Sequence, residues 1–235
     1  MKILAIDGNS IFNRAFYGVK MLTTKDGRCT NAIYGFITML NKIIEETVPD
    51  RIAIAFDRKG PTFRHKIYDG YKAKRKGMPK ELALQFPVLK DLLRLLGYQL
   101  LECDGFEADD ILGTFAKKCD ETQNQCIIAT GDRDILQLVS GNVSVRIIST
   151  KFGKSVITTY DEDAVKEKYM MTPKQLIELK AIQGDISDNI PGVPGIGEKG
   201  ASDLIQKFGS VDNVYENINS SDIKESVRKK LIAGK

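Results

Sequence analysis

The chain has 235 residues, 42% of them apolar, and its 35 basic residues outnumber its 31 acidic residues to give a net charge of +4. This length provides for one large domain, or one domain with an appendage, and no apolar run approaches the roughly 18 residues of a membrane span. Four cysteines without a C-x-x-C pair and a single histidine argue against a zinc site and fit a reducing, cytoplasmic location.

Strands and helices are predicted to alternate over the first 160 residues. Amphipathic helices are expected near 31–47 and 81–96, from apolar residues recurring every three or four positions. Short apolar strands are expected at 2–6, 52–56, 98–101 and 125–130, with a hairpin-like pair at 143–148 and 156–158. This order is typical of an α/β fold with a mainly parallel twisted sheet flanked by helices. We therefore expect an α/β domain over 1–160 and a helical region over 161–235.

Acidic residues follow the predicted parallel strands. A helix N-terminus accommodates one or two acids, so those near residue 107 alone fit either a solvated cap or a metal site. The carboxyl ends of parallel strands meet at one edge, where ligands bind, so all these acids are expected to converge. Their repulsion would destabilise that edge without a cation, which favours a divalent-metal site. The acids are Asp7, Asp57, Glu107, Asp109, Asp110, Asp132 and Asp134.

Residues 58–80 hold nine basic residues and only one acid, Asp69, with Phe63, Tyr68 and Tyr71 interleaved. Such a segment is either a solvated loop or a surface for a phosphate backbone and stacked bases. We favour the second interpretation, because the segment leaves a strand end that carries an acid, and we expect it to be mobile without its ligand.

A glycine- and proline-rich run at 184–200 separates a helix that is predicted to end near residue 183 from further helices over 201–235. Gly195-x-Gly197-x-x-Gly200 matches a dinucleotide-binding pattern, but nearby prolines oppose the strand that this pattern requires. A helix–turn–helix hairpin fits better, because glycines allow a phosphate to approach and Lys199 opens the next helix. Asp185 and Asp188 could reach the acidic edge.

Six segments carry a family resemblance. They are IDGNS at 6–10 with Arg14, AFD-x-KG-x-TFR at 55–64, YK-x-x-R at 71–75, G-x-EADD at 105–110, TGD-x-D at 130–134 and GD-x-SDNIPGVPGIG at 184–197. In this order they resemble the 5′-nuclease (flap endonuclease) family, most closely the N-terminal 5′→3′ exonuclease domains of bacterial DNA polymerase I. The resemblance covers nearly the whole chain.

The resemblance implies a PIN-like 5′-nuclease fold with a helix-hairpin-helix motif at 184–200. It implies an enzyme that cuts 5′ flaps and removes nucleotides from 5′ ends in DNA replication, including primer removal, and in repair. Two Mg²⁺ ions, or Mn²⁺, are expected, with K⁺ at the hairpin. One metal would lie among Asp7, Asp57, Glu107, Asp109 and Asp132, and the second toward Asp110, Asp134, Asp185 and Asp188. The remaining chain then has 35 basic against 22 acidic residues, which suits a polyanionic substrate.

The family also implies roles for basic residues. Residues 58–80 match its arch, where Lys72 and Arg75 are candidates for stabilising the transferring phosphate and Arg14 for gripping it. Arg64 contacts DNA or pairs with an acid as a structural residue. Further DNA contacts are expected at Tyr71, Gly192, Gly195, Gly197 and Lys199.

The expected partners are DNA with a 5′ flap or 5′ end and RNA primers, bound by a monomer without a membrane. The family domain normally continues beyond residue 235, so the chain is expected to be truncated at its C-terminus, and both a nuclease that works alone and a part of a longer polymerase stay open. Two alternatives stay open. A PIN-type ribonuclease would lack the arch and the hairpin, and a non-catalytic DNA-structure binder would hold flaps without a metal-dependent product.

Overall fold

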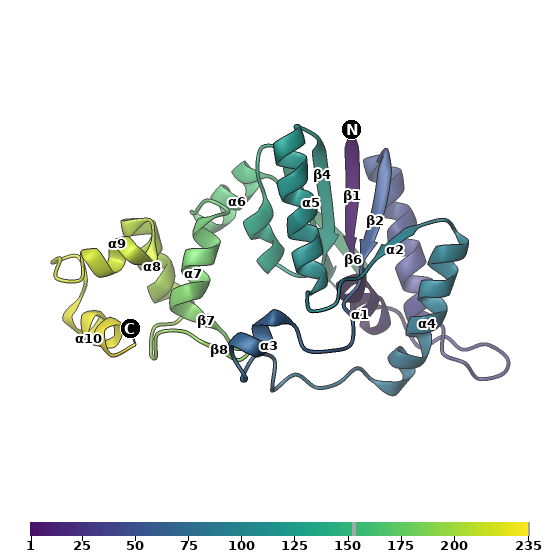
Figure 1. Ribbon diagram of the computed structural model, residues 1–235, viewed down its shortest axis with the longest axis horizontal. Helices are drawn as coiled ribbons and strands as arrows, with labels where there is room; N and C mark the ends of the chain where they lie inside the picture. Colours follow the sequence, from purple (N-terminus) through teal and green to yellow (C-terminus); the bar gives the residue numbers. More distant parts are fainter. Residues whose placement is uncertain (152–153, 235) are drawn as a thin grey trace. The chain divides into compact units, whose positions relative to one another are not determined.

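The computed structural model describes residues 1–151 and 154–234, which form two units (Figure 1). The first unit consists of residues 1–63 and 77–162, and the second of residues 64–76 and 163 onward. The predicted boundary at 160 lies close to the observed one. Residues 64–76, which the prediction placed in the α/β domain, are grouped with the second unit, where the Lys72 N–H donates to the Asp188 carbonyl and Asn189 donates to the Gly70 carbonyl.

The first unit is built on a six-stranded sheet in the order β3-β2-β1-β4-β5-β6. All neighbouring strands are parallel except β5 and β6, so the predicted α/β architecture with a mainly parallel sheet is confirmed. The Phe152-Gly153 turn of the predicted hairpin lies outside the described residues. The strands are β1 (Lys2–Asp7), β2 (Arg51–Ala55), β3 (Gln99–Leu101), β4 (Gln125–Thr130), β5 (Val143–Lys151) and β6 (Lys154–Tyr160).

Helices cover both faces of this sheet. Figure 1 shows α5 on one side of the strands and α2 and α4 on the other. Phe12, Phe36 and Phe56 are fully buried in the core on the side of α2 and α4. The helices are α1 (Gly8–Gly18), α2 (Asn31–Thr47), α4 (Lys80–Leu95) and α5 (Ala108–Thr122), with the 3-10 helix η1 (Asp134–Leu138).

The chain leaves the central strand β1 toward β2 and β3, and later returns to its other side through β4 and β5. This reversal makes the carboxyl ends of β1 and β4 the switch point of the sheet, where open α/β sheets bind their ligands. β1 and β4 are in register there, with Ile6 opposite Ala129. Asp7 therefore ends β1 directly beside the loop that follows β4.

The second unit is helical, with its own apolar core that includes Leu179, Ile182, Ile205 and Leu231. A short antiparallel pair, β7 with β8, was not predicted. None of the described helices combines the length and the apolar character needed to cross a bilayer. The elements are α7 (Gln175–Gln183), β7 (Gly184–Asp185), β8 (Ile190–Pro191), α8 (Glu198–Phe208), α9 (Val211–Glu216) and α10 (Glu225–Ala233), while α3 (Phe63–Ile67) and α6 (Glu162–Tyr169) straddle the boundaries.

Candidate active site

Asp7 lies at the switch point and is only 4% exposed. Its Oδ1 accepts the backbone N–H of Ser10 at 3.0 Å, and its Oδ2 accepts the hydroxyl of Thr130 at 2.7 Å. The same Thr130 hydroxyl accepts the backbone N–H of Asp132 at 2.9 Å. One buried threonine thus joins the end of β1 to the loop that carries the next acid.

Asp57 connects the end of β2 to the start of α5. Its Oδ1 accepts the backbone N–H of Ala108 at 2.7 Å, and its own N–H donates to Asn9 Oδ1 at 2.9 Å. At the same helix start, Asp110 Oδ2 accepts the backbone N–H of Glu107 at 2.9 Å. The acids near residue 107 therefore cap α5 and also lie beside Asp57. Asp110 caps α5, and the α5 N-terminus meets Asp57 at the carboxyl edge of the sheet.

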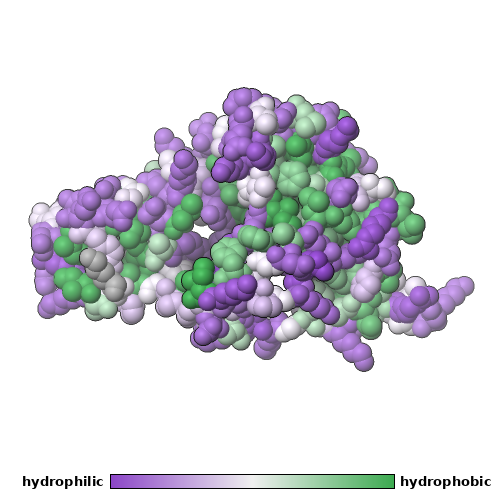
Figure 2. Space-filling view, viewed as in Figure 1, coloured by the Kyte–Doolittle hydropathy of each residue, from purple (hydrophilic) through white to green (hydrophobic). Residues whose placement is uncertain are grey.

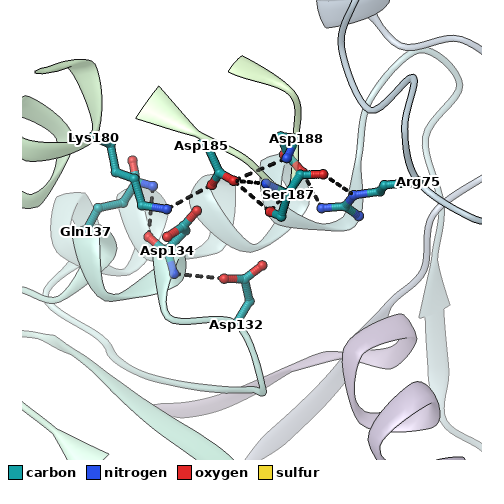
Figure 3. A network of polar contacts seen from close by, with 8 residues as sticks. All are labelled: Arg75, Asp132, Asp134, Gln137, Lys180, Asp185, Ser187 and Asp188. Carbon is teal, nitrogen blue, oxygen red and sulfur yellow. Dashed lines mark hydrogen bonds and ion pairs between the residues drawn. The ribbon is translucent and has the colours of Figure 1, made fainter. Parts of the chain in front are cut away.

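Asp132 and Asp134 follow β4 and are shown in Figure 3. The backbone N–H of Asp134 donates to Asp132 Oδ1 at 2.9 Å. Asp134 begins η1, and its carbonyl accepts the Gln137 side chain at 2.9 Å. The loop is thus held by its own hydrogen bonds, which fix the backbone from which both carboxylates extend.

Negative charge is concentrated around Asp7, from the carboxylates of Asp57 and Asp132. Burial raises its pKa from the ordinary 3.8 to about 6, with the charges of Asp57 and Asp132 adding to the rise and the hydrogen bonds from Ser10 and Thr130 opposing it. Asp57 and Asp132 are therefore close enough to Asp7 to repel its carboxylate. Within residues 1–151 and 154–234, however, no three His, Cys, Asp or Glu side chains are grouped tightly enough to ligate an ion without moving.

That spacing is compatible with carboxylates that draw together when a cation offsets their repulsion. The side chains are oxygen donors without histidine or cysteine among them, which is the ligand chemistry that Mg²⁺ and Mn²⁺ prefer. The donor set therefore fits a hard divalent ion.

Asp7→Asn should stabilise the fold in a chelator-containing buffer. The folded state holds the Asp7 proton up to about pH 6, whereas the unfolded chain releases it near 3.8. Ionisation therefore lowers the free energy of unfolding as the pH rises from about 4 to about 6. Urea unfolding of the variant should show a gain of at most about 3 kcal/mol at pH 7.5. The gain should shrink toward zero at pH 4, and a gain independent of pH would contradict the assignment.

Arg14, on α1, reaches the same edge. Its Nη2 donates to the Gly131 carbonyl at 3.4 Å, while its Nε is buried and finds no hydrogen-bond partner among the described residues. A Cβ at Gly131 would lie 2.7 Å from that Nε, so glycine makes room for the guanidinium. Burial, with Arg133 nearby, lowers the pKa of Arg14. A buried donor without an acceptor costs free energy, which sets Arg14 apart from the other buried polar side chains of the described residues.

Asp185 and Asp188 form a network inside the second unit (Figure 3). Asp185 accepts Lys180 Nζ at 2.8 Å, the Ser187 N–H at 2.8 Å and the Ser187 hydroxyl at 2.7 Å. Burial would raise the pKa of Asp185, but the hydrogen bonds from Lys180 and Ser187 outweigh burial and lower it. Asp188 pairs with Arg75. Both acids thus have cationic partners, which the sequence did not predict.

The predicted catalytic residues of the arch are tied to this network. Arg75 is paired with Asp188, and the backbone N–H of Lys72 donates to the Asp188 carbonyl at 2.8 Å. Lys72 adopts a left-handed φ of 55°, and its Nζ lies 4.9 Å from the centre of the Tyr71 ring. Tyr71 is 5% exposed and packs edge-to-face on His65. Its ring is therefore closed to stacking from the open surface.

Three glycines, Gly192, Gly195 and Gly197, were predicted to let a phosphate approach the backbone, and they differ in conformation and in the space around them. Gly195 has φ 80°, and its carbonyl accepts Lys230 Nζ at 2.8 Å. Gly197 caps α8, ahead of Lys199 in its first turn, and a Cβ there would meet nothing within 4 Å. A Cβ on Gly192 would lie 2.3 Å from the backbone of Gln183, so the chain's own packing requires that glycine.

Gly192→Ala should destabilise the second unit by more than 1 kcal/mol, because its methyl group would overlap fixed backbone and not a movable side chain. The matched change Gly197→Ala adds the same methyl group in open space and should leave the unfolding midpoint unchanged. Thermal unfolding followed by circular dichroism compares the two variants. Equal midpoints would show that Gly192 is not required for packing.

The whole chain matches two consecutive domain families. Residues 2–170 match the "5′-3′ exonuclease, N-terminal resolvase-like domain", and residues 171–235 match the "5′-3′ exonuclease, C-terminal SAM fold". The chain belongs to the 5′-3′ exonuclease family. The resemblance read from the six sequence segments is therefore confirmed.

Relatives of this chain include two DNA polymerases I. That of Caldicellulosiruptor bescii is 45% identical over 100% of the chain and 27% of its own length, and that of Bacillus caldotenax is 45% identical over 97% and 26%. The chain spans about a quarter of the length of these curated relatives.

Solved structures show the same fold. The zinc-bound 5′-exonuclease of T5 aligns with TM-score 0.76 at 23% identity, covering 99% of this chain and 84% of its own. A bacteriophage T5 flap endonuclease, in a pseudo-enzyme-product complex with DNA and metal ions, aligns with TM-score 0.75 over the same shares.

From the sequence, Asn9 and Ser10 are interpreted as caps of the first helix, whereas the structure has Asp7 as the N-cap of α1, and Thr130 is given no role. Asn9 holds the Asp57 backbone, Ser10 accepts the Gly131 N–H at 2.9 Å, and Thr130 links Asp7 to Asp132. Their sequence positions could have identified them, because each is a short polar residue close to an acid at a strand end. Such side chains commonly hydrogen-bond nearby backbone, but the particular partner depends on which strands are neighbours.

Proposed function

We propose that this protein is a divalent-metal-dependent 5′ nuclease that hydrolyses phosphodiester bonds at 5′ flaps and 5′ ends of DNA. The observation that carries the proposal is the convergence of Asp7, Asp57 and Asp132 at the switch point, close enough for two charges to raise the pKa of the third. A basic body around this acidic edge suits a polyanion that is handled through metal ions. Replication, including primer removal, and repair are the expected settings, because relatives are DNA polymerases I.

In this proposal, the carboxylates at the sheet edge are the metal ligands. Asp7, Asp57, Glu107, Asp109 and Asp132 hold one ion, and Asp110 and Asp134 lie toward a second. Bound Mg²⁺ ions would supply Lewis-acid activation of a water molecule and would offset negative charge on the scissile phosphate. Arg14, whose Nε has no partner among the described residues, grips a phosphate oxygen.

To bind the second ion, Asp185 and Asp188 must each break an ion pair with a lysine or an arginine of the second unit. Asp188 would release Arg75, which is then available to the transferring phosphate beside Lys72. Asp185 would release Lys180 while keeping its hydrogen bonds to Ser187. The loss of these ion pairs is offset by contact with a doubly charged ion, which attracts each carboxylate more strongly than a lysine or arginine does.

The proposal also covers the identity of the ions, the RNA substrate, the oligomeric state and the location. Mg²⁺ is the expected ion and Mn²⁺ a substitute, since both take oxygen ligands. K⁺ at the hairpin would compete with the Lys230 ammonium for the Gly195 carbonyl. RNA primers are a further substrate, and the protein acts as a monomer, within a longer polymerase chain, in the cytoplasm at the nucleoid.

One gel tests the proposal. A 5′-labelled flap duplex is incubated with the purified protein and Mg²⁺, with and without EDTA, beside a single-stranded RNA of the same length. We expect a short labelled DNA product that EDTA abolishes. Tight flap binding without any product in Mg²⁺ or Mn²⁺ would support the non-catalytic binder instead. Cleavage of the RNA alone would support the PIN-type ribonuclease.

A further inference from the structure

Lys90, on α4, is largely enclosed by the first unit although it carries a charge. Figure 2 shows hydrophilic side chains projecting from the surface, which is the usual position of a lysine. The Lys90 side chain is only 14% exposed and pairs with Glu102, the residue that follows β3. Its Nζ lies 4.4 Å from the centre of the Phe86 ring and 5.0 Å from the centre of the Phe56 ring. Two aromatic rings and one carboxylate therefore surround the ammonium group.

An ammonium group in these surroundings restricts how its neighbours move. The attraction between a cation and the face of an aromatic ring is stronger where water is excluded than at an exposed site. An aliphatic side chain could fill the same space, but it would attract neither a ring face nor a carboxylate. Lys90 therefore holds the Phe56 ring by an attraction that packing alone would not provide.

The Phe56 ring connects Lys90 to the acidic edge. Phe56 is fully buried, and the next residue is Asp57. A Cβ on Gly8, the residue after Asp7, would lie 2.3 Å from the Phe56 ring, so the ring lies directly against the Gly8 backbone. One ring thus belongs to the residue before one acid and contacts the residue after the other.

The end of β3 belongs to the same arrangement. The Phe56 N–H donates to the Leu101 carbonyl at 2.9 Å, and Glu102 is the next residue along the chain. Lys90 reaches that carboxylate from α4. The hydrogen bond and the ion pair together join α4, the end of β3 and the residue that follows β2.

We propose that Lys90 is a positioning residue for the divalent-metal site and acts through the Phe56 ring. Lys90 fixes the ring, and the ring sets the separation between the backbone at Asp7 and the backbone at Asp57. A misplacement of about 1 Å is enough to impair a metal site or a catalytic step. The inference rests on the proposed function and deepens it, because it assigns a residue outside the acidic edge to the alignment of the metal ligands.

Mn²⁺ binding to the DNA-free protein tests this role. Lys90→Met keeps most of the aliphatic stem and removes the ammonium group, while the Glu102 side chain, 26% exposed, still reaches water. Paramagnetic resonance of free Mn²⁺, recorded below the unfolding midpoint, should give a Kd about tenfold higher than that of the wild type, the loss typical of a group that orients metal ligands. Lys90→Arg keeps a cation and should restore the Kd to within threefold. Flap Kd in EDTA should change less than twofold in both variants.

Two further variants separate positioning from general loss of stability. Arg146, whose side chain is 16% exposed, pairs with Glu46 and so matches Lys90 in burial and in having an acidic partner. Arg146→Met should lower the unfolding midpoint and leave the Mn²⁺ Kd within twofold. Phe56→Leu should weaken Mn²⁺ binding by itself. Adding Lys90→Met to it should change the Kd less than twofold further, because the ring through which Lys90 acts is then missing.

An unchanged Mn²⁺ Kd in Lys90→Met, or an equal loss in Arg146→Met, would overturn the positioning role. If Lys90→Met does not fold, Glu102→Gln provides the test, because it leaves the ammonium group in place without its carboxylate partner. The Mn²⁺ Kd of Glu102→Gln should rise about threefold, and an unchanged value would equally overturn the role.

Failure of this inference and failure of the proposed function are distinguishable. If the wild type binds Mn²⁺ and cleaves the flap while Lys90→Met keeps its Mn²⁺ affinity, the nuclease assignment stands and the positioning role is wrong. If the wild type neither binds Mn²⁺ nor cleaves the flap, the proposed function is wrong, and the role of Lys90 falls with it.

Discussion

Asp132→Asn should reduce Mg²⁺-dependent flap cleavage by at least about 10³-fold while flap binding survives. Metal ions contribute several kcal/mol of charge stabilisation in phosphoryl transfer, and each 1.4 kcal/mol is a factor of ten in rate. Removing one charged ligand weakens that contribution. Binding should persist or improve, because the change deletes a negative charge that faces a polyanion.

The substitution is structurally mild. Asparagine keeps an Oδ1 that can accept the Asp134 N–H, as Asp132 does at 2.9 Å. Asp109→Asn, in the first turn of α5, should give the same loss through a different element. Asp91→Asn is the matched control, since Asp91 is 71% exposed and pairs with Arg94 on the surface of α4. Single-turnover rates over a Mg²⁺ titration and Kd in Ca²⁺ make the comparison, and near-normal cleavage by either site variant would refute the ligand assignment.

The sheet and its acidic edge were predictable because short-range patterns determine them. An apolar run of four or five residues that ends in an acid identifies both a buried strand and the edge at which it ends. Asp7, Asp57 and Asp132 could be assigned to one place without knowing the strand order, because all parallel strands end at the same edge. The start of α5 followed similarly from its acids and from the apolar spacing after them.

The partners of Asp185 and Asp188 were not predictable in the same way. Arg75 is 113 residues from Asp188, and their pairing depends on how the segment 64–76 packs beside the hairpin. The sequence assigned Arg75 to a phosphate and Asp188 to a metal, each by family resemblance. The structure shows the two side chains bound to each other, which makes each role conditional on their separation.

Tyr71 and Gly192 illustrate the same limit. Aromatic residues among basic ones suggested stacking, yet Tyr71 is buried against His65. A glycine near a predicted phosphate site suggested ligand approach, yet Gly192 faces the backbone at the end of α7. In both cases the residue type suggested a role in binding, but the packing of the folded chain decides what the residue contacts.

Lys72→Met should slow cleavage by about 10²-fold or more while changing flap Kd less than threefold. A preorganised donor aimed at developing negative charge typically contributes 10²–10³ in rate when it is removed singly. Methionine keeps the aliphatic stem that packs near the Tyr71 ring but removes the ammonium group. The backbone N–H of residue 72 still donates to Asp188, so the position of the segment should be retained.

Lys74→Met is the matched control, because Lys74 lies in the same basic segment and is exposed. If both lysines act only through general attraction to phosphate, each substitution should weaken binding modestly and reduce the salt dependence of Kd by a similar amount. If a lysine acts in the transition state, its substitution should greatly lower the single-turnover rate and leave the flap Kd almost unchanged. A Lys72→Met variant in which Kd alone moves would therefore reduce Lys72 to a phosphate contact, and would leave Arg75, once released from Asp188, as the remaining candidate in this segment.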